Sequence, residues 1–204
     1  MDMIHTIAIG AGMAWASGMR LYAVMFAAGL LASFGIVTLP GDLTVLSHPW
    51  VVGASGLMFF VEFFADKIPG VDSLWDAIHT FIRIPAGALL AAASLGIHAD
   101  PALVLTAGIL GGTLASSSHF AKAGSRALIN TSPEPFSNWA ASFFEDGLTG
   151  VTLWLAFTHA WAFLGLLLVM VILSFWLIRS LWRFLSGMFR KLSLPALNPP
   201  HFSP

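Results

Sequence analysis

Four ionisable residues recur at helical spacing within one stretch of this sequence. Asp72, Asp76, His79 and Arg83 are separated by four, three and four positions, which places them on one face of a helix. The residues that follow Arg83 are largely apolar, so this face leads into a hydrophobic segment. An ionisable group in such a segment is costly unless it is paired or hydrated, and it marks an ion, proton or solute pathway by default.

Further ionisable residues lie within or at the ends of other apolar stretches. Together with that helix face they form the candidate ion-binding or solute-binding set: Arg20, Glu62, Asp66, Asp72, Asp76, His79, Arg83, Lys122, Arg126, Glu145 and Asp146. We expect this set to line a polar, water-filled vestibule with Arg20 and Arg83 at its floor. Both signs of charge are present, so the charge of the substrate stays open. No catalytic residue and no cofactor are predicted.

Two other interpretations of these residues stay open. In the first, the charges only pair helices with one another. Asp72 and Asp76 complement the positive start of a helix, and Glu145 and Asp146 pair with Lys122 or Arg126. In the second, four carboxylates offer hard oxygen ligands to a divalent cation, although no metal-binding motif is recognisable. These four are Glu62, Asp66, Asp72 and Asp146. His119, close to Lys122, is expected at the membrane interface.

The composition decides the class of protein. The chain has 204 residues, of which 57% are hydrophobic and 9% are charged, and it contains no cysteine. Soluble domains carry about 25% charged residues, so too few charges are present here to cover a surface that faces water. We therefore expect most of the chain to lie in a lipid bilayer. A net charge of −1 and the lack of a basic, aromatic-rich patch argue against nucleic-acid binding.

Apolar windows predict an all-α polytopic bundle of six to seven transmembrane spans, which forms one domain over residues 1–185. A spanning helix needs about 20 mostly apolar residues. The windows are Ile4–Leu39, Pro49–Ala65, Asp72–Ile97, Ala102–Ala121, Phe136–Thr158 and Trp161–Ile178. The first window is too long for one simple span. We expect it to be broken or re-entrant at Ser17-Gly18, so that it crosses once or twice.

The distribution of Lys and Arg predicts the orientation. Residues 186–204 form a basic and then proline-rich tail, and the loops with Lys67 and Arg126 fall on the same side as this tail. Cytoplasmic flanks retain positive charge, so we expect the carboxy terminus to be cytoplasmic and the tail to be disordered. The amino terminus is cytoplasmic if residues 4–39 cross once and external if they cross twice.

Polar residues between two of the windows form a loop. The stretch from Asn130 to Asn138 contains two prolines and is expected to cap the following helix through its Ser and Asn side chains. The alternative is a re-entrant segment whose helix start faces an anion.

Five segments carry a resemblance to a known family: Ala16–Arg20, Val61–Asp76, Arg83–Ala88, Lys122–Arg126 and Ser142–Asp146. On these segments the chain resembles the family known as domain of unknown function 4126, small polytopic membrane proteins found mostly in bacteria. The likeness extends over residues 4–177. It implies a multi-pass protein of the bacterial inner (plasma) membrane and supplies no activity.

The leading functional hypothesis is a small transporter or channel-like protein that moves an ion or small polar solute, with a vestibule open to the cytoplasm. The lipid bilayer and that solute are the expected partners, and an oligomer is compatible with the sequence. One alternative is an intramembrane enzyme that acts on a lipid head group, with carboxylates as general bases or Mg²⁺ ligands and arginines that bind phosphate. Another is a non-catalytic assembly or lipid-binding subunit.

Overall fold

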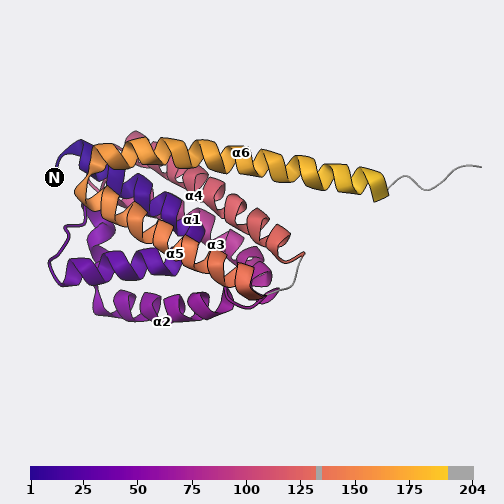
Figure 1. The fold of residues 1–204 in the computed structure, drawn as a ribbon. Helices are drawn as coiled ribbons and strands as arrows, with labels where there is room; N and C mark the ends of the chain where they lie inside the picture. The colour runs from indigo at the N-terminus through magenta and orange to yellow at the C-terminus, as the bar shows by residue number, and fades with distance from the viewer. Residues whose placement is uncertain (132–134, 193–204) are drawn as a thin grey trace, which may run out of the picture.

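The computed structural model describes residues 1–131 and 135–192. Its elements are α1 (Met3–Ser33), the 3-10 helix η1 (Gly41–Ser47), α2 (Pro49–Ala65), α3 (Val71–Ala93), α4 (Pro101–Ile129), α5 (Pro135–Thr158) and α6 (Ala160–Leu192) (Figure 1). No strand occurs among the described residues, so the prediction of an all-α fold is confirmed.

The number of helices that can cross a membrane is smaller than expected. Three are long and apolar enough: α1, α4 and the Ala160–Phe184 part of α6. The pair of η1 and α2, bent by 72°, gives a fourth if it counts as one span. The described residues therefore support a membrane protein with three or four such helices, and the six to seven predicted spans are not confirmed. α3 and α5 carry the ionisable residues singled out above, which lower their hydropathy.

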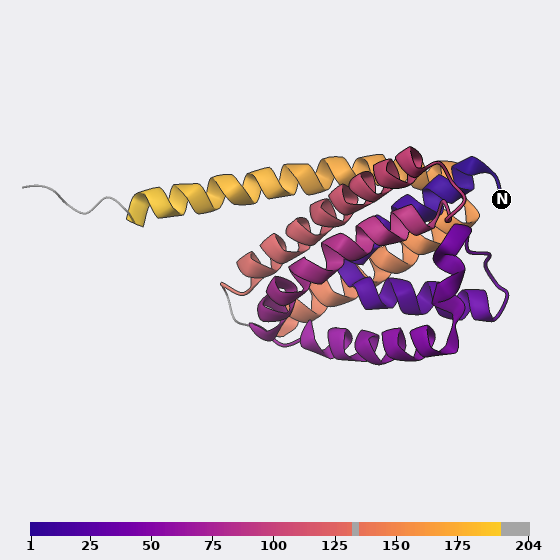
Figure 2. The ribbon, with the colours of Figure 1, turned by 180° about the vertical axis from the view of Figure 1, so that it is seen from behind.

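α1 is broken at Arg20, whose backbone torsions (φ −145°, ψ 76°) are not helical. At Arg20 the chain reverses, and the second half of α1 returns to the end of the molecule where the chain begins (Figures 1 and 2). Contacts of the two halves agree with this, since Gly10 lies against Ser94, after α3, and Gly29 lies against Leu46 of η1. The predicted break near the amino terminus is thus present, in the form of a helical hairpin.

The break falls at Arg20 rather than at the predicted Ser17-Gly18. Both of those residues are helical and buried. The Ser17 hydroxyl donates to the carbonyl oxygen of Ala14 at 2.7 Å. Gly18 lies so close to α4 that a Cβ in its place would clash with the carbonyl group of Ala115.

The reversal gives the bundle two unlike ends. The amino-terminal end holds both ends of α1, and also the loops 34–40 and 94–100. The charged end holds the turn 66–70, the end of α4 and the second half of α6, which projects beyond the other helices (Figure 1). α6 continues through Leu192, so residues 186–192 of the expected tail are helical. Residues 193–204, on which the rest of that expectation falls, lie outside the described residues.

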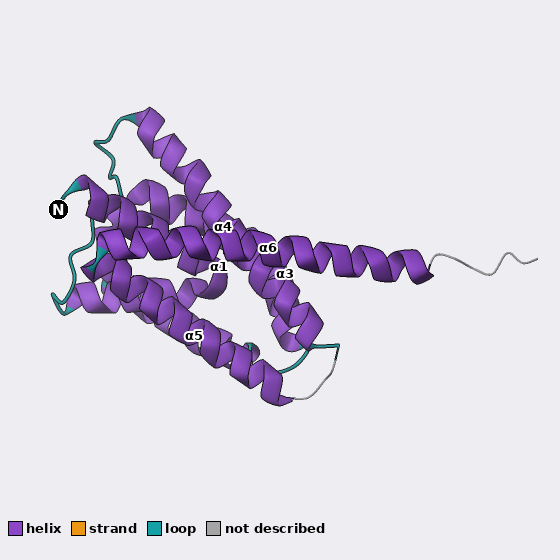
Figure 3. Ribbon diagram, turned by 45° about the horizontal axis from the view of Figure 1, so that its top comes forward, coloured by secondary structure: helices purple, strands orange, loops and turns teal. Residues whose placement is uncertain are grey.

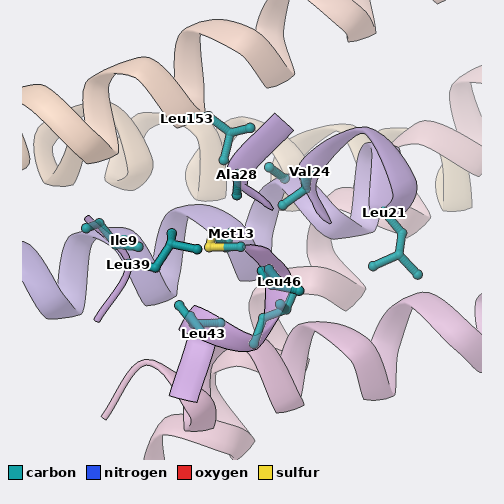
Figure 4. Packing of buried hydrophobic residues seen from close by; sticks show 11 residues of the cluster. Ile9, Met13, Leu21, Val24, Ala28, Leu39, Leu43, Leu46 and Leu153 are labelled. Atoms are coloured by element: carbon teal, nitrogen blue, oxygen red, sulfur yellow. The ribbon is translucent and has the colours of Figure 1, made fainter. Parts of the chain in front are cut away.

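Apolar side chains pack the amino-terminal end. Ile9 and Met13 of α1 contact Leu39, Leu43 and Leu46, which come from η1 and the loop before it (Figure 4). All five are buried. Because full burial of such a side chain contributes about 1.5–3 kcal/mol, η1 acts as an apolar clasp on the hairpin.

The outer surface of the bundle is also apolar. Phe81 and Trp50 are each 83% exposed, and large aliphatic side chains are exposed along α2, α4 and α6. Contiguous apolar surface of this extent is unfavourable in water and suits a lipid environment. The described structure therefore agrees with the prediction of a membrane protein.

Candidate functional site

A cluster of charged side chains fills the charged end of the bundle. We call it the charged cluster, and it contains ten of the eleven residues predicted from the sequence: Arg20, Glu62, Asp66, Asp72, Asp76, Arg83, Lys122, Arg126, Glu145 and Asp146. Helices α1 to α5 and the residue after α2 contribute to it. All ten side chains are buried except that of Asp146, which is 24% exposed.

Arg20 reaches the centre of the cluster because it sits at the break of α1. Its Nη1 lies 2.6 Å from Oδ2 of Asp66, directly after α2. Its Nη2 donates to Oγ of Ser142 at 2.8 Å and to the carbonyl oxygen of Ser142 at 3.1 Å. The same Nη2 lies 3.1 Å from Oδ1 of Asp146. One guanidinium therefore links α1 to α2 and to α5.

Arg83 is the buried cation of α3. Its Nη2 donates to Oε1 of Glu62 at 2.6 Å, and its Nη1 donates to Oδ1 of Asp76 at 2.7 Å. Asp76 lies two turns before Arg83 on the same helix face, as the spacing predicts. Because both carboxylates and the guanidinium are out of contact with solvent, removal of any one member leaves an uncompensated charge.

α4 supplies two further cations, one turn apart. Nζ of Lys122 donates to Oδ2 of Asp66 at 2.7 Å and to the carbonyl oxygen of Met19 at 3.2 Å. Arg126 binds Glu145 through two parallel bonds, from Nε to Oε1 at 2.9 Å and from Nη2 to Oε2 at 2.8 Å. Two-pronged pairs of this kind are among the strongest ion pairs. The pairing of α4 with α5 is therefore present, as one of the open interpretations expected.

Asp72 is held by hydrogen bonds rather than by a close cation. Its Oδ1 accepts from the backbone N–H groups of Gly70 at 2.9 Å and Ser73 at 2.7 Å, and from Nδ2 of Asn130 at 2.8 Å. The nearest cationic atom in its ion pairs is Nη1 of Arg126, at 3.9 Å. Asp72 therefore stabilises the start of α3, which is the structural role considered for it above.

His79 lies on the predicted helix face but beside the cluster. Its ring stacks on that of Trp75 at 4.0 Å between centroids. Nδ1 is 2.8 Å from the carbonyl oxygen of Trp75, and Nε2 is 3.3 Å from the hydroxyl of Tyr22. Its hydrogen-bond partners are thus a carbonyl and a phenol, and it is the one predicted site residue that the structure leaves outside the cluster.

His119, expected at the membrane interface, lies inside the bundle. His119 is fully buried, with Nε2 2.7 Å from the hydroxyl of Thr80 and Nδ1 3.4 Å from Nη1 of Arg83. Its polar partners, Thr80 and Arg83, come from α3, and the sequence alone does not show that they lie beside His119. His119, Lys122 and Arg126 are separated by three and four positions. This helical spacing is the sequence signal that places all three on one helix face.

Asn130 and Asn138, predicted only as part of a capping loop, also contact the charged cluster. Nδ2 of Asn138 donates to Oδ1 of Asn130 at 2.9 Å, and the carbonyl oxygen of Asn138 accepts from Arg126 at 3.0 Å. Asn138 lies inside α5 instead of in the predicted capping loop. Residues 132–134 of that loop lie outside the described residues, so the re-entrant alternative is not tested.

The cluster approaches the surface at Asp146 and Lys67. The ammonium group of Lys67 lies 3.1 Å from the ring centroid of Phe63 and 4.7 Å from that of Phe143, and it donates to Oγ of Ser142 at 3.2 Å. We call Lys67, Phe63 and Phe143 the aromatic cap. Burial lowers the pKa of Lys67 although the negative charge of Asp146 opposes this shift.

Asp146 is the least compensated carboxylate of the cluster. Neither of its oxygens has a hydrogen-bond partner. The guanidinium nearest to it, that of Arg20, lies closer to Asp66. Every other carboxylate has a cation within 2.8 Å or, in the case of Asp72, three N–H donors.

The expected open vestibule is replaced by a closed cluster. The charges face one another because an unpaired charge in a medium of low polarity costs more than the ordering of a pair. The four carboxylates considered for a divalent cation instead face cations or helix starts: Glu62, Asp66, Asp72 and Asp146. Within residues 1–131 and 135–192, no group of three or more His, Cys, Asp or Glu is arranged to hold a metal ion.

Comparisons with known proteins give a family match for this chain. A family model described as "Domain of unknown function (DUF4126)" matches residues 7–180, a stretch that includes the entire charged cluster. No curated protein and no solved structure matches the chain.

Proposed function

Because the chain belongs to this family, whose description assigns no activity, we propose from the geometry of its own site that it transports a small cation across a membrane. The cation is a proton or a monovalent metal ion, and the charged cluster is its binding site. The protein is then a small transporter or channel-like protein, and the structure described above is its closed state.

The single observation that carries this proposal is the state of Asp146. Its side chain is 24% exposed where the cluster meets the surface, but both carboxylate oxygens are buried and have no hydrogen-bond partner. A proton or a cation at this position removes the cost of its poorly compensated charge. The ammonium of Lys67 is a covalently attached cation in the same region and interacts electrostatically with Asp146. When Lys67 swings outward, an incoming ion compensates the charge of Asp146 in its place.

The broken helix supports the same function. Non-helical backbone at membrane depth is tolerated only where it is buried in protein or lines a cavity, and discontinuous helices form the ion sites of many transporters. Arg20 occupies such a break and pairs with both Asp66 and Asp146. A small shift of the α1 hairpin would separate these charges and open the cluster toward the amino-terminal end.

The orientation that we propose follows from the exposed cations. Arg179 and Arg183 lie on the part of α6 that belongs to the charged end, and both are exposed. Retention of positive charge on the cytoplasmic side places the charged end and the carboxy terminus in the cytoplasm of a bacterial inner membrane. The amino terminus is then external, because both ends of the α1 hairpin lie at the opposite end of the bundle.

Flux measurements on purified protein in liposomes test the proposal. Vesicles with an imposed gradient of H⁺, Na⁺ or K⁺ and an internal dye that responds to that ion are compared with protein-free vesicles. We expect faster movement of one of these ions with the wild-type protein and loss of most of that flux in Asp146→Asn. The control is Asp42→Asn, which removes an exposed carboxylate at the amino-terminal end and should leave the flux unchanged.

Two results would contradict cation transport. One is the absence of flux for all three ions with protein that unfolds at a normal temperature. The other is equal flux in the wild type and in Asp146→Asn. Either result would favour the interpretation that the charged cluster only pairs helices.

A further inference from the structure

The last helix is longer than the hydrocarbon core of a bilayer is thick. α6 has 33 residues, which is about 50 Å at the rise of an α-helix, whereas the core is about 30 Å thick. Figure 3 shows that its second half extends past the other helices. Arg179 is the first basic residue of α6 and stands about 29 Å from Ala160 along the helix axis. Arg179 is therefore at the level where a spanning α6 leaves the acyl chains and meets the head groups.

One exposed face of α6 changes from apolar to basic at this level. Ile172, Trp176, Arg179 and Arg183 are separated by four, three and four positions, which places them on one side of the helix. Ile172 is 58% exposed and Trp176 is 65% exposed, and both arginines are exposed as well. We call these four residues the basic face. It presents an aliphatic side chain, then an indole and then two guanidinium groups.

The two arginines of the basic face have no counter-ion of their own. In the part of the chain that the structure describes, neither Arg179 nor Arg183 forms an ion pair, whereas the four cations of the charged cluster all face carboxylates. The sequence after Asp146 contains no Asp or Glu. Two exposed and uncompensated cations one turn apart therefore call for an anion from outside the chain.

We propose that the basic face binds an anionic phospholipid in the leaflet at the charged end of the bundle. Residues four apart on a helix have Cβ atoms about 5–6 Å apart, which is close enough for the guanidinium groups of Arg179 and Arg183 to bind one phosphate. Trp176 then lies at the level of the glycerol esters, where indoles are enriched, and an acyl chain lies along Ile172. This inference is independent of the proposed cation transport, since it rests on α6 alone.

The head group must be anionic rather than zwitterionic. A choline or ethanolamine group would bring an ammonium next to Arg179 and Arg183, where no carboxylate is present to receive it. A soluble phosphate ester would satisfy the arginines but leave Ile172 and Trp176 exposed. An anionic phospholipid matches both the basic and the apolar part of this face.

Titration of the full-length protein with phosphatidylglycerol in a neutral detergent, followed by native mass spectrometry, tests the inference. Phosphatidylcholine with the same acyl chains is the zwitterionic probe. We expect the wild type to bind phosphatidylglycerol more tightly than phosphatidylcholine. Arg179→Gln with Arg183→Gln should weaken phosphatidylglycerol binding about 25-fold, because each arginine near an anionic lipid surface contributes about a factor of five. The same double variant should bind phosphatidylcholine as the wild type does.

A second double variant is the matched control. Arg190→Gln with Lys191→Gln removes the same charge from the same helix, roughly 10–12 Å beyond Arg183 along the axis. Charges at this distance are largely screened at 0.1 M salt, where the Debye length is about 10 Å. The control should therefore bind phosphatidylglycerol nearly as the wild type does. Thermal unfolding in detergent shows whether each variant is folded, which we expect because Arg179 and Arg183 are exposed.

Three results would overturn the proposal. Equal loss of phosphatidylglycerol affinity in the two double variants would mean a diffuse attraction to positive charge instead of a site. Equal affinity of the wild type for both lipids would mean that the arginines do not select the head group. Displacement of phosphatidylglycerol by an equal concentration of glycerol 3-phosphate would identify a site for a soluble phosphate ester.

Discussion

The two ends of the bundle are held together by different interactions, although the same helices run through both. At the amino-terminal end, Ile9 and Met13 pack against leucines of η1. At the charged end, Arg20 and Arg83 each bridge carboxylates on more than one element. Removal of apolar atoms from a core lowers the free energy of unfolding in proportion to the volume of the cavity that is left. Removal of one partner of a buried ion pair leaves the other charge buried and uncompensated. The charged end is therefore the more vulnerable end to single substitutions and the more easily switched one.

The largest expected effect is at Arg83. Arg83→Met leaves Glu62 and Asp76 buried without their cation, so we expect a loss of about 3–5 kcal/mol in the free energy of unfolding. Denaturation in detergent micelles measures this change. Arg179→Met removes an exposed arginine and should have an effect close to zero. A loss under about 1 kcal/mol at Arg83 would mean that water reaches the cluster, contrary to its closed form.

The next largest effect is expected at the amino-terminal end. Leu43 is 1% exposed and belongs to the apolar clasp on the hairpin. Leu43→Ala should cost about 2–5 kcal/mol, and the same unfolding experiment measures it. Val45→Ala, on the exposed side of η1, is the matched control. If the two substitutions had equal effects, η1 would not be packed on α1 as described.

A smaller effect is expected where α3 and α4 meet. A Cβ on Gly111 would clash with Ala91 and with the carbonyl oxygen of Gly87, so Gly111→Ala should cost about 1–3 kcal/mol. Gly108 is on the same helix, and the nearest atom to a Cβ there is 3.7 Å away. Gly108→Ala should be neutral or slightly stabilising, since alanine favours helix. The reverse order of the two midpoints of unfolding would contradict this packing.

The smallest effect concerns pH and the aromatic cap. Because the pKa of Lys67 is lowered by folding, the unfolded chain holds more protons between the lowered pKa and the ordinary value near 10.5. Stability therefore rises with pH through this window, and it is constant below it as far as Lys67 is concerned. Partial exposure screens the effect and keeps it small. Lys67→Met should lack this rise when the free energy of unfolding is measured against pH. A wild-type free energy of unfolding that falls with pH relative to that of Lys67→Met would contradict the lowered pKa of Lys67.

The sequence predicts helix boundaries and helix faces better than it predicts the break in α1 and the contacts between helices. The start of α2 at Pro49 and the shared face of Asp72, Asp76 and Arg83 follow from proline placement and helical periodicity, which are local properties. Ten of the eleven predicted site residues meet in one cluster for the same reason, since each stands out against an apolar background.

The rest depends on contacts between distant segments. The break falls at Arg20, which is neither proline nor glycine, and the guanidinium of this residue pairs with Asp66 and Asp146 from distant segments. The burial of His119 depends on Thr80 and Arg83 in another helix. The closed form of the cluster likewise results from pairings that only the folded chain brings together.

The hairpin of α1 sets a constraint on how the protein is made. The ribosome synthesises Arg20 first, but its counter-ions come later, with Asp66 after α2 and Asp146 within α5. A cation inside an apolar segment is unfavourable in the bilayer until such partners arrive. The compensation of Arg20 is therefore complete only after Asp66 and Asp146 have both been synthesised.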